Sequence, residues 1–512
     1  MKPRSWTHSE DSEATSLPSV AAYDSLPADS HAYTMPEFAQ RFFRRPQGLL
    51  PATGEGTTVD LVQYTKVPIQ ESLIALGDKD MNKRAVESFQ ALMQFMGDQS
   101  KPRNKDDLEL LYDLLKASRE ERLRDEIYCQ VIKQVTGHPQ SGHCTRGWTF
   151  LSLLTGFFPP STTLMPYVTK FLQDTGPSQE LARRSQEHLQ RTVKYGGHQQ
   201  LPLPGEMQAF LKGQAVRMLL IHLPGGVDYK TNIHTFTVVS EVLEELCGRM
   251  GIMDPQEMQE FALFVIKGEG DLVRPLRLSE YLNSVMGAPD LSLHARRLGW
   301  ESQLHFDHST YISVHYHQVL RDYLQGKLLV SAQADAQLAH LAALQHVSKA
   351  TKEPPSEQDL LLYVPKPLTS QVDMAAIKGR MGQELRQLQG HSSQDAQISF
   401  IEAVTRLPLF GYTVYVVLRV SELAMPRPSL LGLNRQHLIL MDPNSQKLCC
   451  SIALAEVQRL HVLSPLEEGG PPALELNHGS AHSPRTIWFE LPQVRAHLPG
   501  FGGRGSGEAG LR

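Results

Sequence analysis

Hydrophobic residues in the first two-fifths of the chain recur at the spacing of amphipathic helices. Steps of three and four residues place such side chains on one face of a helix. Two stripes of this kind are formed by Leu108, Leu111 and Leu115 and by Leu123, Ile127, Val131 and Val135. Proline and glycine interrupt the pattern at Pro102, at 137–139 and at 157–160. The pattern predicts an all-α bundle over residues 36–207.

After residue 213 the spacing changes to that of β-strands. The runs VRMLLIHL and VDYKTNIHTFTV flank a turn at Pro224-Gly225-Gly226, which predicts a hairpin. A helical stripe over 239–250 follows, and FALFVIKG then predicts a further strand. Strand, turn, strand, helix, strand is the order of a ubiquitin-like fold. We therefore expect an α+β lobe over residues 213–300.

The remainder predicts one more helical region and one more β region. Residues 301–405 have a helical period, and residues 406–495 contain four strand-like runs, GYTVYVVLRV, HLILM, KLCCSIAL and TIWFEL. The ends lack a hydrophobic period. Residues 1–35 are rich in Ser, Asp, Ala and Pro, which predicts a disordered linker, and residues 496–512 are rich in Gly, which predicts a flexible tail. The predicted fold class is multidomain α+β.

Composition limits the kinds of protein that this chain can be. With 512 residues, 41% of them hydrophobic, it is long enough for several units of roughly 100–200 residues, each with its own core. A net charge of −5 provides no general attraction for nucleic acid or an anionic membrane, so no nucleic-acid partner is expected. Five scattered cysteines, three of them inside apolar stretches, predict buried free thiols in a reducing compartment. The N-terminus has no signal-peptide pattern, and a cytoplasmic location is expected.

Several segments carry a family resemblance. The helical region resembles the MyTH4 domain of myosin tails, most specifically in LRDEIYCQVIKQV (123–135) and RGWTFLSLLTGFFPPS (146–161), and also in YTMPEFAQRFFR (33–44) and VPIQESLI (67–74). The rest resembles a FERM domain of three lobes: the ubiquitin-like lobe, a helical lobe with YHQVLRDYLQGKL (316–328), and a pleckstrin-homology-like (PH-like) lobe that starts near FGYTVYVV (410–417). The tandem order is most similar to that of class XV unconventional myosins.

This resemblance implies a function as well as a fold. It implies a non-catalytic, cytoskeleton-associated adaptor in which a MyTH4 helical bundle packs with a FERM unit and links an actin-based motor to cargo proteins held in FERM grooves. Some family members bind microtubules through basic MyTH4 surfaces, and some FERM proteins bind phosphoinositide headgroups. A microtubule-binding or phosphoinositide-binding cytoskeletal linker is therefore the alternative function.

Three departures from the family limit what can be transferred. No motor signature is present, because Gly326-Lys327 is followed by Leu328, where a phosphate-binding loop needs Ser or Thr to hold magnesium. ATP hydrolysis by a myosin mechanism is not expected. Pro492 and Pro499 interrupt the region where a FERM third lobe has its last helix, so the main peptide groove is expected to be incomplete. A truncated form with weakened function is a further alternative.

The third departure is at the extreme C-terminus. Its last residue, Arg512, lacks the apolar side chain that a PDZ pocket accepts. The same tail contains the spacing G-x-G-x-x-G at Gly505, Gly507 and Gly510, but the chain ends before the helix that a dinucleotide site needs. No nucleotide cofactor is predicted.

One basic cluster is the candidate partner-binding site. It consists of Lys79, Lys83, Arg84, Lys101, Arg103 and Lys105, and Arg183, Arg184, Arg191 and Lys194 could extend it. Such a surface would attract the acidic surface of tubulin in a salt-dependent way. Nearby acidic residues, among them Asp106, Asp107 and Glu109, roughly cancel this charge. Solvated helix surface is therefore the preferred interpretation.

The sequence shows weak candidates for catalysis or metal binding. Asp125 and Glu126 are adjacent on a predicted helix, where they point about 100° apart and cannot act on one bond, so they are interpreted as structural hydrogen-bonding groups. Two groups of histidines lack the spacing of a zinc motif. They are His138 with His143-Cys144, and His305, His308, His315 and His317. The nucleophile pattern G-x-S-x-G is also missing. No enzyme activity, cofactor or metal is predicted.

Overall fold

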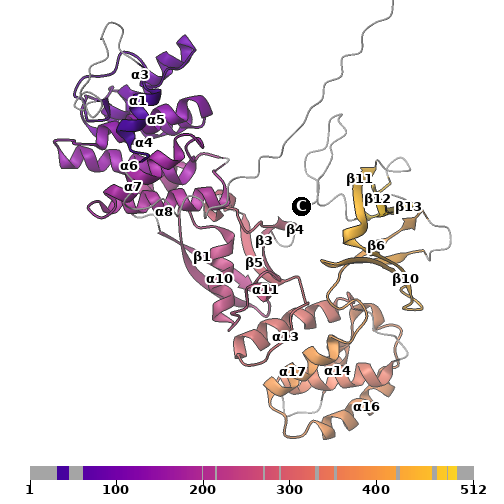
Figure 1. Cartoon of the computed structure of the whole chain (residues 1–512). Helices are drawn as coiled ribbons and strands as arrows, with labels where there is room; N and C mark the ends of the chain where they lie inside the picture. Colours follow the sequence, from indigo (N-terminus) through magenta and orange to yellow (C-terminus); the bar gives the residue numbers. More distant parts are fainter. Residues whose placement is uncertain are drawn as a thin grey trace, which may run out of the picture. The chain divides into compact units, whose positions relative to one another are not determined.

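The computed structural model describes eleven stretches of the chain, residues 32–44, 61–198, 200–213, 216–268, 271–286, 290–328, 334–350, 355–421, 427–463, 470–480 and 483–492. They form two compact units. The first comprises residues up to Arg217 together with two later segments, Ile233–Val238 and Ser279–Gly287. The second comprises Met218–Asn232, Val239–Leu278 and residues from Ala288 onward. Figure 1 shows the helices and strands in chain order.

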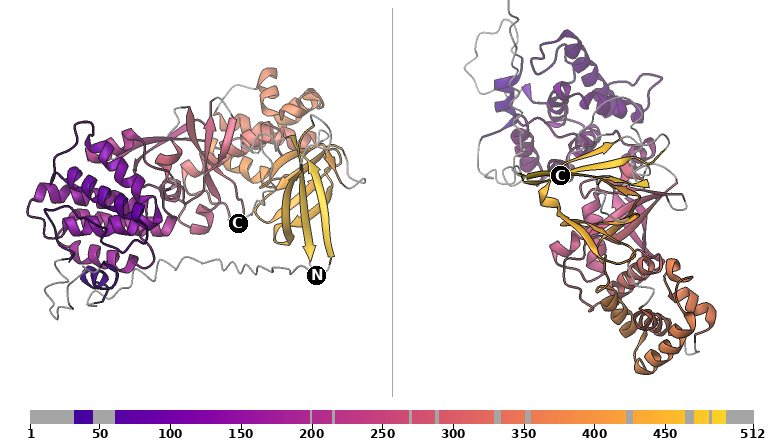
Figure 2. Two further views of the ribbon diagram at one scale, coloured as in Figure 1. Left: turned by 90° about the horizontal axis from the view of Figure 1, so that it is seen from above. Right: turned by 90° about the vertical axis from the view of Figure 1, so that its right-hand side faces the viewer.

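The first unit is built from helices around one apolar core. Its helices are α1 (Met35–Phe42), α3 (Lys79–Met96), α4 (Asp107–Ser118), α5 (Glu121–Val135), α6 (Ser141–Phe157), α7 (Met165–Thr175), α8 (Glu180–Tyr195) and α9 (Pro204–Leu211). Both predicted stripes lie in this core, because Leu111, Leu115, Leu123 and Ile127 are fully buried. The two views of Figure 2 show these helices packed as a bundle.

Local sequence signals explain where the helices begin and end. Asp106 and Glu109 form a reciprocal capping box at the start of α4, which satisfies two backbone amides that the helix itself leaves unpaired. Helix α3 ends at Gly97, whose φ of 103° lies in the left-handed region that glycine adopts without strain. Residue 98 is thereby turned away from the helix axis.

The core of the first unit also includes an aromatic residue from far along the chain. Phe236 is 2% exposed and belongs to the same core as helices α5 and α6. Its ring lies against Gly156 of α6 so closely that a Cβ atom built on Gly156 would be 2.3 Å from Cζ of Phe236. Gly156 therefore occupies a helix interior position, where glycine is usually unfavourable, because any side chain would displace the phenyl ring.

The first sheet of the second unit has five strands. They are β1 (Val216–Leu223), β2 (Val227–His234), β3 (Phe261–Lys267), β4 (Asp271–Pro275) and β5 (Leu291–Arg297), in the order β2-β1-β5-β3-β4. Strands β1 and β5 are parallel, and Ile221 pairs with Leu293 and His222 with His294. Helix α10 (Val239–Arg249) follows the hairpin, and the short helix α11 (Pro255–Met258) precedes β3. The short helix α12 (Leu282–Val285) follows β4 in the chain and belongs to the first unit. This is the predicted ubiquitin-like order.

The rest of the second unit has a helical part and a β part. The helices are α13 (Ser309–Leu324), α14 (Asp335–Ser348), α15 (Glu357–Tyr363), α16 (Met374–Gln387) and α17 (Ser393–Val404). Two four-stranded sheets follow, ordered β10-β9-β8-β6 and β11-β12-β13-β7. Their strands are β6 (Thr413–Val417), β7 (Arg419–Val420), β8 (Ser429–Leu433), β9 (His437–Met441), β10 (Leu448–Ala453), β11 (Val457–Leu463), β12 (Ala473–Ser480) and β13 (Ser483–Glu490).

The predicted fold class is confirmed: helices and sheets combine as α+β in a multidomain chain. The expectation of buried cysteines holds for Cys129 and Cys247 but is wrong for Cys449, which is exposed because it lies on β10 at the end of a sheet. Residues 1–31 of the predicted linker 1–35, the predicted tail 496–512 and the interrupted last helix beyond Pro492 lie outside the described residues, whereas Met35 begins helix α1. None of the helices described has the length and apolar character needed to span a bilayer.

We predict that Gly156→Ala destabilises the first unit by about 1–3 kcal/mol, because the added methyl group overpacks the contact with Phe236. In an ordinary helix interior the same change stabilises by about 1 kcal/mol. Denaturant-dependent hydrogen exchange of peptides from α6 would measure the loss.

The matched control is Gly142→Ala in the same helix, where nothing lies within 4 Å of the new Cβ atom and stability should be unchanged or slightly raised. A double-mutant cycle with Phe236→Ala should remove most of the cost at position 156. If Gly156→Ala stabilised as much as Gly142→Ala does, the close contact would not exist.

Candidate functional site

The basic cluster predicted from the sequence lies on α3 and on the loop that precedes α4. Lys79, Lys83 and Arg84 are on the first turns of α3, and Lys101, Arg103 and Lys105 are on the loop. Three of the six cations form ion pairs: Lys83 with Glu87 at 3.8 Å, Lys105 with Asp113 at 2.6 Å, and Lys101 with Asp107. Arg146 of α6 also contacts the Asp107 carboxylate, at 2.6 Å.

A groove of about 600 Å³ runs between α3 and α4 beside this cluster. Its walls carry both signs of charge, with Arg84, Lys105 and Lys116 facing the same space as Glu87 and Asp113. Such a mixture cancels at distances beyond about 10 Å in ordinary salt. The groove can hold a polar or amphipathic segment, but it does not present one sign of charge over a wide area.

The adjacent carboxylates Asp125 and Glu126 point to different parts of the first unit. Glu126 is fully buried and accepts hydrogen bonds from the backbone amides of Leu73 and Ile74, each at 2.8 Å. Burial raises the pKa of Glu126, while these amides oppose the shift. Asp125 instead accepts the amide of Ser161 at 2.9 Å. Each carboxylate therefore holds a loop, as the helix geometry predicts.

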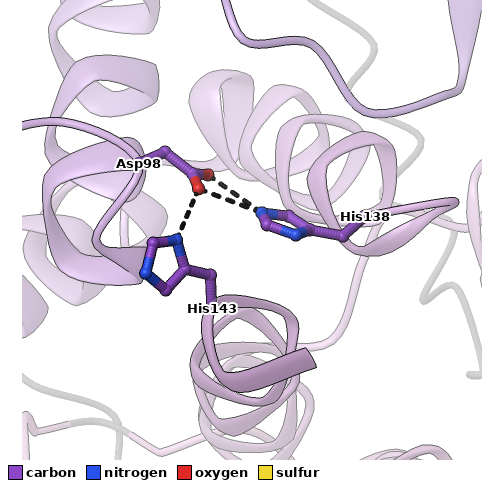
Figure 3. Close-up of side chains that lie close together, drawn as sticks. All are labelled: Asp98, His138 and His143. Carbon is purple, nitrogen blue, oxygen red and sulfur yellow. Dashed lines mark hydrogen bonds and ion pairs between the residues drawn. The ribbon is translucent and has the colours of Figure 1, made fainter. Parts of the chain in front are cut away.

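Asp98, His138 and His143 are brought together by the fold, although 40 or more residues separate the aspartate from the histidines. Figure 3 shows the carboxylate between the two rings. His138 Nε2 is 3.0 Å from Asp98 Oδ1, and His143 Nδ1 is 2.9 Å from the same oxygen. One ligand atom from each residue lies within 4.8 Å of the others, so the group could in principle hold a metal ion.

The hydrogen bonds of this cluster argue against a metal. The backbone amide of Gln140 donates to His138 Nδ1 at 3.0 Å, so that nitrogen is an acceptor and the ring proton resides on Nε2, which donates to Asp98. A metal on Nε2 would move the proton to Nδ1, where it would face the Gln140 amide. The cluster is better explained as a polar connection between the end of α3 and the loop before α6.

Two histidines, the buried His198 and the partly buried His188, lie against Phe236 in the first unit. His188 contacts the Phe236 ring at 4.4 Å between ring centres, and His198 stacks on Tyr281 at 3.7 Å. Neither ring nitrogen of His198 has a hydrogen-bond partner within the described residues. Burial lowers the pKa of His188 to about 4 and that of His198 to about 3. Both rings are therefore neutral at physiological pH.

Sequence reasoning missed Arg297, whose side chain makes hydrogen bonds to several others in the described part of the second unit. Its guanidinium is fully buried on β5 and donates to Glu260 at 2.5 and 2.9 Å and to Glu257 at 2.9 Å. It also lies over the rings of Phe261 and Trp300, with its central carbon 5.5 and 4.9 Å from the ring centres. The sequence around Arg297 does not indicate these ion pairs, because Glu257 and Glu260 lie 40 and 37 residues away in the chain.

Helix α13 completes the surroundings of Arg297. Tyr311 Oη accepts a hydrogen bond from Nη1 at 2.8 Å, and His315 Nε2 lies 3.0 Å from the same nitrogen. Burial, reinforced by the charge of Arg297, lowers the pKa of His315 to about 3, so its neutral ring can accept this hydrogen bond. Gln318 of α13 exchanges hydrogen bonds with the backbone of residue 297. Arg297 thus ties α11, β5 and α13 together.

Comparisons with known families and proteins agree with this architecture. Residues 112–209 match the MyTH4 domain family, and residues 301–415 match the FERM central domain family. Human unconventional myosin-XVB is 71% identical over 500 residues, covering 97% of this chain and 16% of that protein. Human unconventional myosin-XV is 34% identical over 489 residues, covering 90% of this chain and 14% of that protein. The chain therefore spans less than a fifth of these relatives.

Solved structures show the same fold. The C-terminal MyTH4-FERM domain of human myosin 7b, in complex with the harmonin-a PDZ3 domain, is 23% identical with a TM-score of 0.61. It covers 90% of this chain and 94% of that one. The MyTH4-FERM MF1 domain of Dictyostelium discoideum myosin VII is 19% identical with a TM-score of 0.59, covering 91% and 95%.

We predict that Arg297→Met destabilises the second unit by about 3–5 kcal/mol, because two buried carboxylates lose their counter-charge. Arg296→Met is the matched control. The neighbouring Arg296 pairs with Asp322 at 2.9 Å but is partly exposed, so its loss should cost no more than about 1 kcal/mol. Urea unfolding followed by hydrogen exchange of α13 would measure both, and equal effects would contradict a special role for Arg297.

We also predict that acid weakens the first unit. His188 and His198 have folded pKa values below the unfolded value of about 6.5, so the stability they contribute is fully present above pH 6.5 and falls as the pH drops toward 4. At pH 5 the loss should reach about 2 kcal/mol for each histidine. Hydrogen exchange of α6 and α8 as a function of pH would measure it.

The variant His198→Phe should remove about half of this pH dependence and leave stability near neutral pH unchanged or raised, because the ring nitrogens have no partner to lose. His391→Gln, at an exposed position on the second unit, should leave the pH dependence of the first unit unaltered. An unchanged pH profile in His198→Phe would show that His198 does not titrate as its burial implies.

Proposed function

This chain belongs to the MyTH4-FERM tail segments of unconventional myosins, most like those of class XV, and we propose that it is a non-catalytic adaptor that joins the actin-based motor system to protein partners. The supporting observation is the continuous similarity to myosin tails across both the helical and the FERM regions. MyTH4-FERM segments of this kind are partner-binding domains. The myosin 7b segment in complex with a PDZ domain is one such case.

The polar clusters of the chain fit a structural role better than a catalytic one. In the part of the chain that the structure describes, Glu126 holds the backbone of a loop, Arg297 holds three elements together, and Asp98 holds two histidines. Their hydrogen-bonding capacity is used within the fold. A catalytic group instead has to face a cleft with capacity to spare for the substrate.

The third FERM lobe offers edge strands to an extended partner peptide. Strands β10 and β11 each stand at the end of a sheet, where backbone groups can pair with an added strand. Leu448 on β10 is 53% exposed and Val462 on β11 is 50% exposed. A partner segment could therefore combine backbone pairing with an apolar anchor, which is how peptides bind by strand addition.

The function is tested with the full chain as bait for proteins in a cell lysate, followed by binding measurements with the purified partner. Leu448→Asp or Val462→Asp should weaken partner binding by about ten-fold or more, equivalent to about 1.4 kcal/mol. The matched control is Leu362→Asp, since Leu362 is 63% exposed but lies on helix α15. Equal binding by all three variants would contradict strand addition.

The alternative function rests on Lys79 and Arg103, for which the structure gives no ion pair within the described residues. Two further assays separate it from protein binding. Co-sedimentation with microtubules at low salt that is lost in Lys79→Glu/Arg103→Glu would favour a microtubule linker. Flotation with vesicles that depends on anionic lipid would favour a phosphoinositide linker. The proposed adaptor should do neither.

A further inference from the structure

Two histidines lie directly beside each other on the outer face of the five-stranded sheet of the second unit. His222 on β1 pairs in register with His294 on the parallel strand β5. Their ring centres are 4.8 Å apart and their planes are inclined by 36°. The neighbours Ile221 and Leu293 point to the buried face, so the two histidines point away from the core. Both rings are partly accessible to solvent.

The hydrogen bond to Asp228 determines which nitrogen of His222 is free. His222 Nδ1 lies 2.7 Å from Asp228 Oδ1, across the hairpin of β1 and β2. A carboxylate only accepts hydrogen bonds, so Nδ1 carries the ring proton and Nε2 of the neutral ring presents its lone pair. This arrangement, in which a carboxylate accepts from one nitrogen and leaves the other free, is the usual support of a metal-binding histidine.

The hydrogen bond to Ser292 determines which ring nitrogen of His294 carries the proton. The hydroxyl of Ser292 donates to the carbonyl of Ile266 at 3.4 Å, so its oxygen accepts a hydrogen bond from His294 Nε2 at 3.0 Å. The lone pair of the neutral ring is then on Nδ1. That lone pair can bind a cation.

We propose that His222 and His294 form a two-histidine binding site for a divalent transition metal such as zinc, supported by Asp228. Imidazole nitrogen is a preferred ligand for zinc and copper, and water would complete the coordination. With a zinc–nitrogen bond of about 2.1 Å, each ring centre lies about 3.2 Å from the metal, and a tetrahedral angle then separates the two centres by about 5 Å. The 4.8 Å between the rings, which matches the spacing of neighbouring strands, allows such a site without rearrangement of the backbone.

The metal site is proposed at His222 and His294, and not at Asp98, His138 and His143, because the hydrogen bonds of the two clusters differ. In that cluster the hydrogen bond from Gln140 places the His138 proton on the nitrogen that faces the other two residues. At the His222–His294 site the hydrogen bonds go to Asp228 and Ser292, neither of which is a proposed metal ligand, so each ring keeps one nitrogen for a metal. The proposed metal site is independent of the proposed adaptor function, since neither requires the other.

The test uses the full chain, stripped of metal with a chelator and titrated with zinc against a chromogenic chelator at slightly alkaline pH. The double variant His222→Gln/His294→Gln should bind one equivalent of zinc fewer than the wild type. Asp228→Asn should keep that equivalent but weaken its affinity by about 10–100-fold, the usual effect of removing a carboxylate that supports a ligand histidine. Circular dichroism verifies that each variant is folded.

His317→Gln is the matched control. His317 lies on α13 close to Gly225, and its Nδ1 also has a backbone acceptor, the carbonyl of Ser313 at 2.7 Å, but no second histidine faces it in the described part of the chain. Its replacement should leave zinc binding unchanged. The proposal is wrong if the double variant binds as much zinc as the wild type, or if Asp98→Ala removes the equivalent instead.

Discussion

A buried positive charge governs how the second unit is assembled. Arg297 cannot remain inside the protein without counter-charges, because a desolvated guanidinium costs several kcal/mol unless it is paired and fully hydrogen-bonded. Glu257 and Glu260 provide the charges, and Tyr311, a neutral His315 and the carbonyl of Gly299 accept further hydrogen bonds from the guanidinium. Burial alone would raise the pKa of Glu260, but the hydrogen bond from Ser302 and the charge of Arg297 outweigh it and lower that pKa. The relative positions of α11, β5 and α13 follow from this one requirement.

The first unit also contains a buried charged group, but it compensates that charge with backbone hydrogen bonds. Its buried carboxylate Glu126 is matched by backbone amides rather than by an arginine, and Phe236 packs directly on Gly156 of α6. Among the described residues, Glu126, Asp98 and Arg297 all use their side chains for hydrogen bonds within the fold. What remains for binding is the outside of the molecule: the α3–α4 groove, the edge strands and the outer face of the first sheet.

The sequence predicted the elements well because their signals are local. The stripe from Leu123 to Val135 became one face of α5, and the turn at Pro224–Gly226 joined β1 to β2. Contacts between distant residues had no such signal: nothing near Gly156 indicated that residue 236 would cover it, and nothing near Arg297 indicated Glu257. In the basic cluster, Lys101 and Lys105 pair with Asp107 and Asp113, which lie close to them in sequence. The His138 and His143 pair showed that neighbouring histidines are not enough, because hydrogen bonds decide which nitrogen is free.

The central claim is that this chain acts through its surfaces while its buried polar clusters hold the structure. Hydrogen exchange of the full chain, alone and bound to a purified protein partner, tests it most directly. The account predicts new protection at β10 or β11 and none around Glu126 or the Asp98 cluster. Protection centred on those polar clusters, or chemical conversion of the added partner, would contradict it.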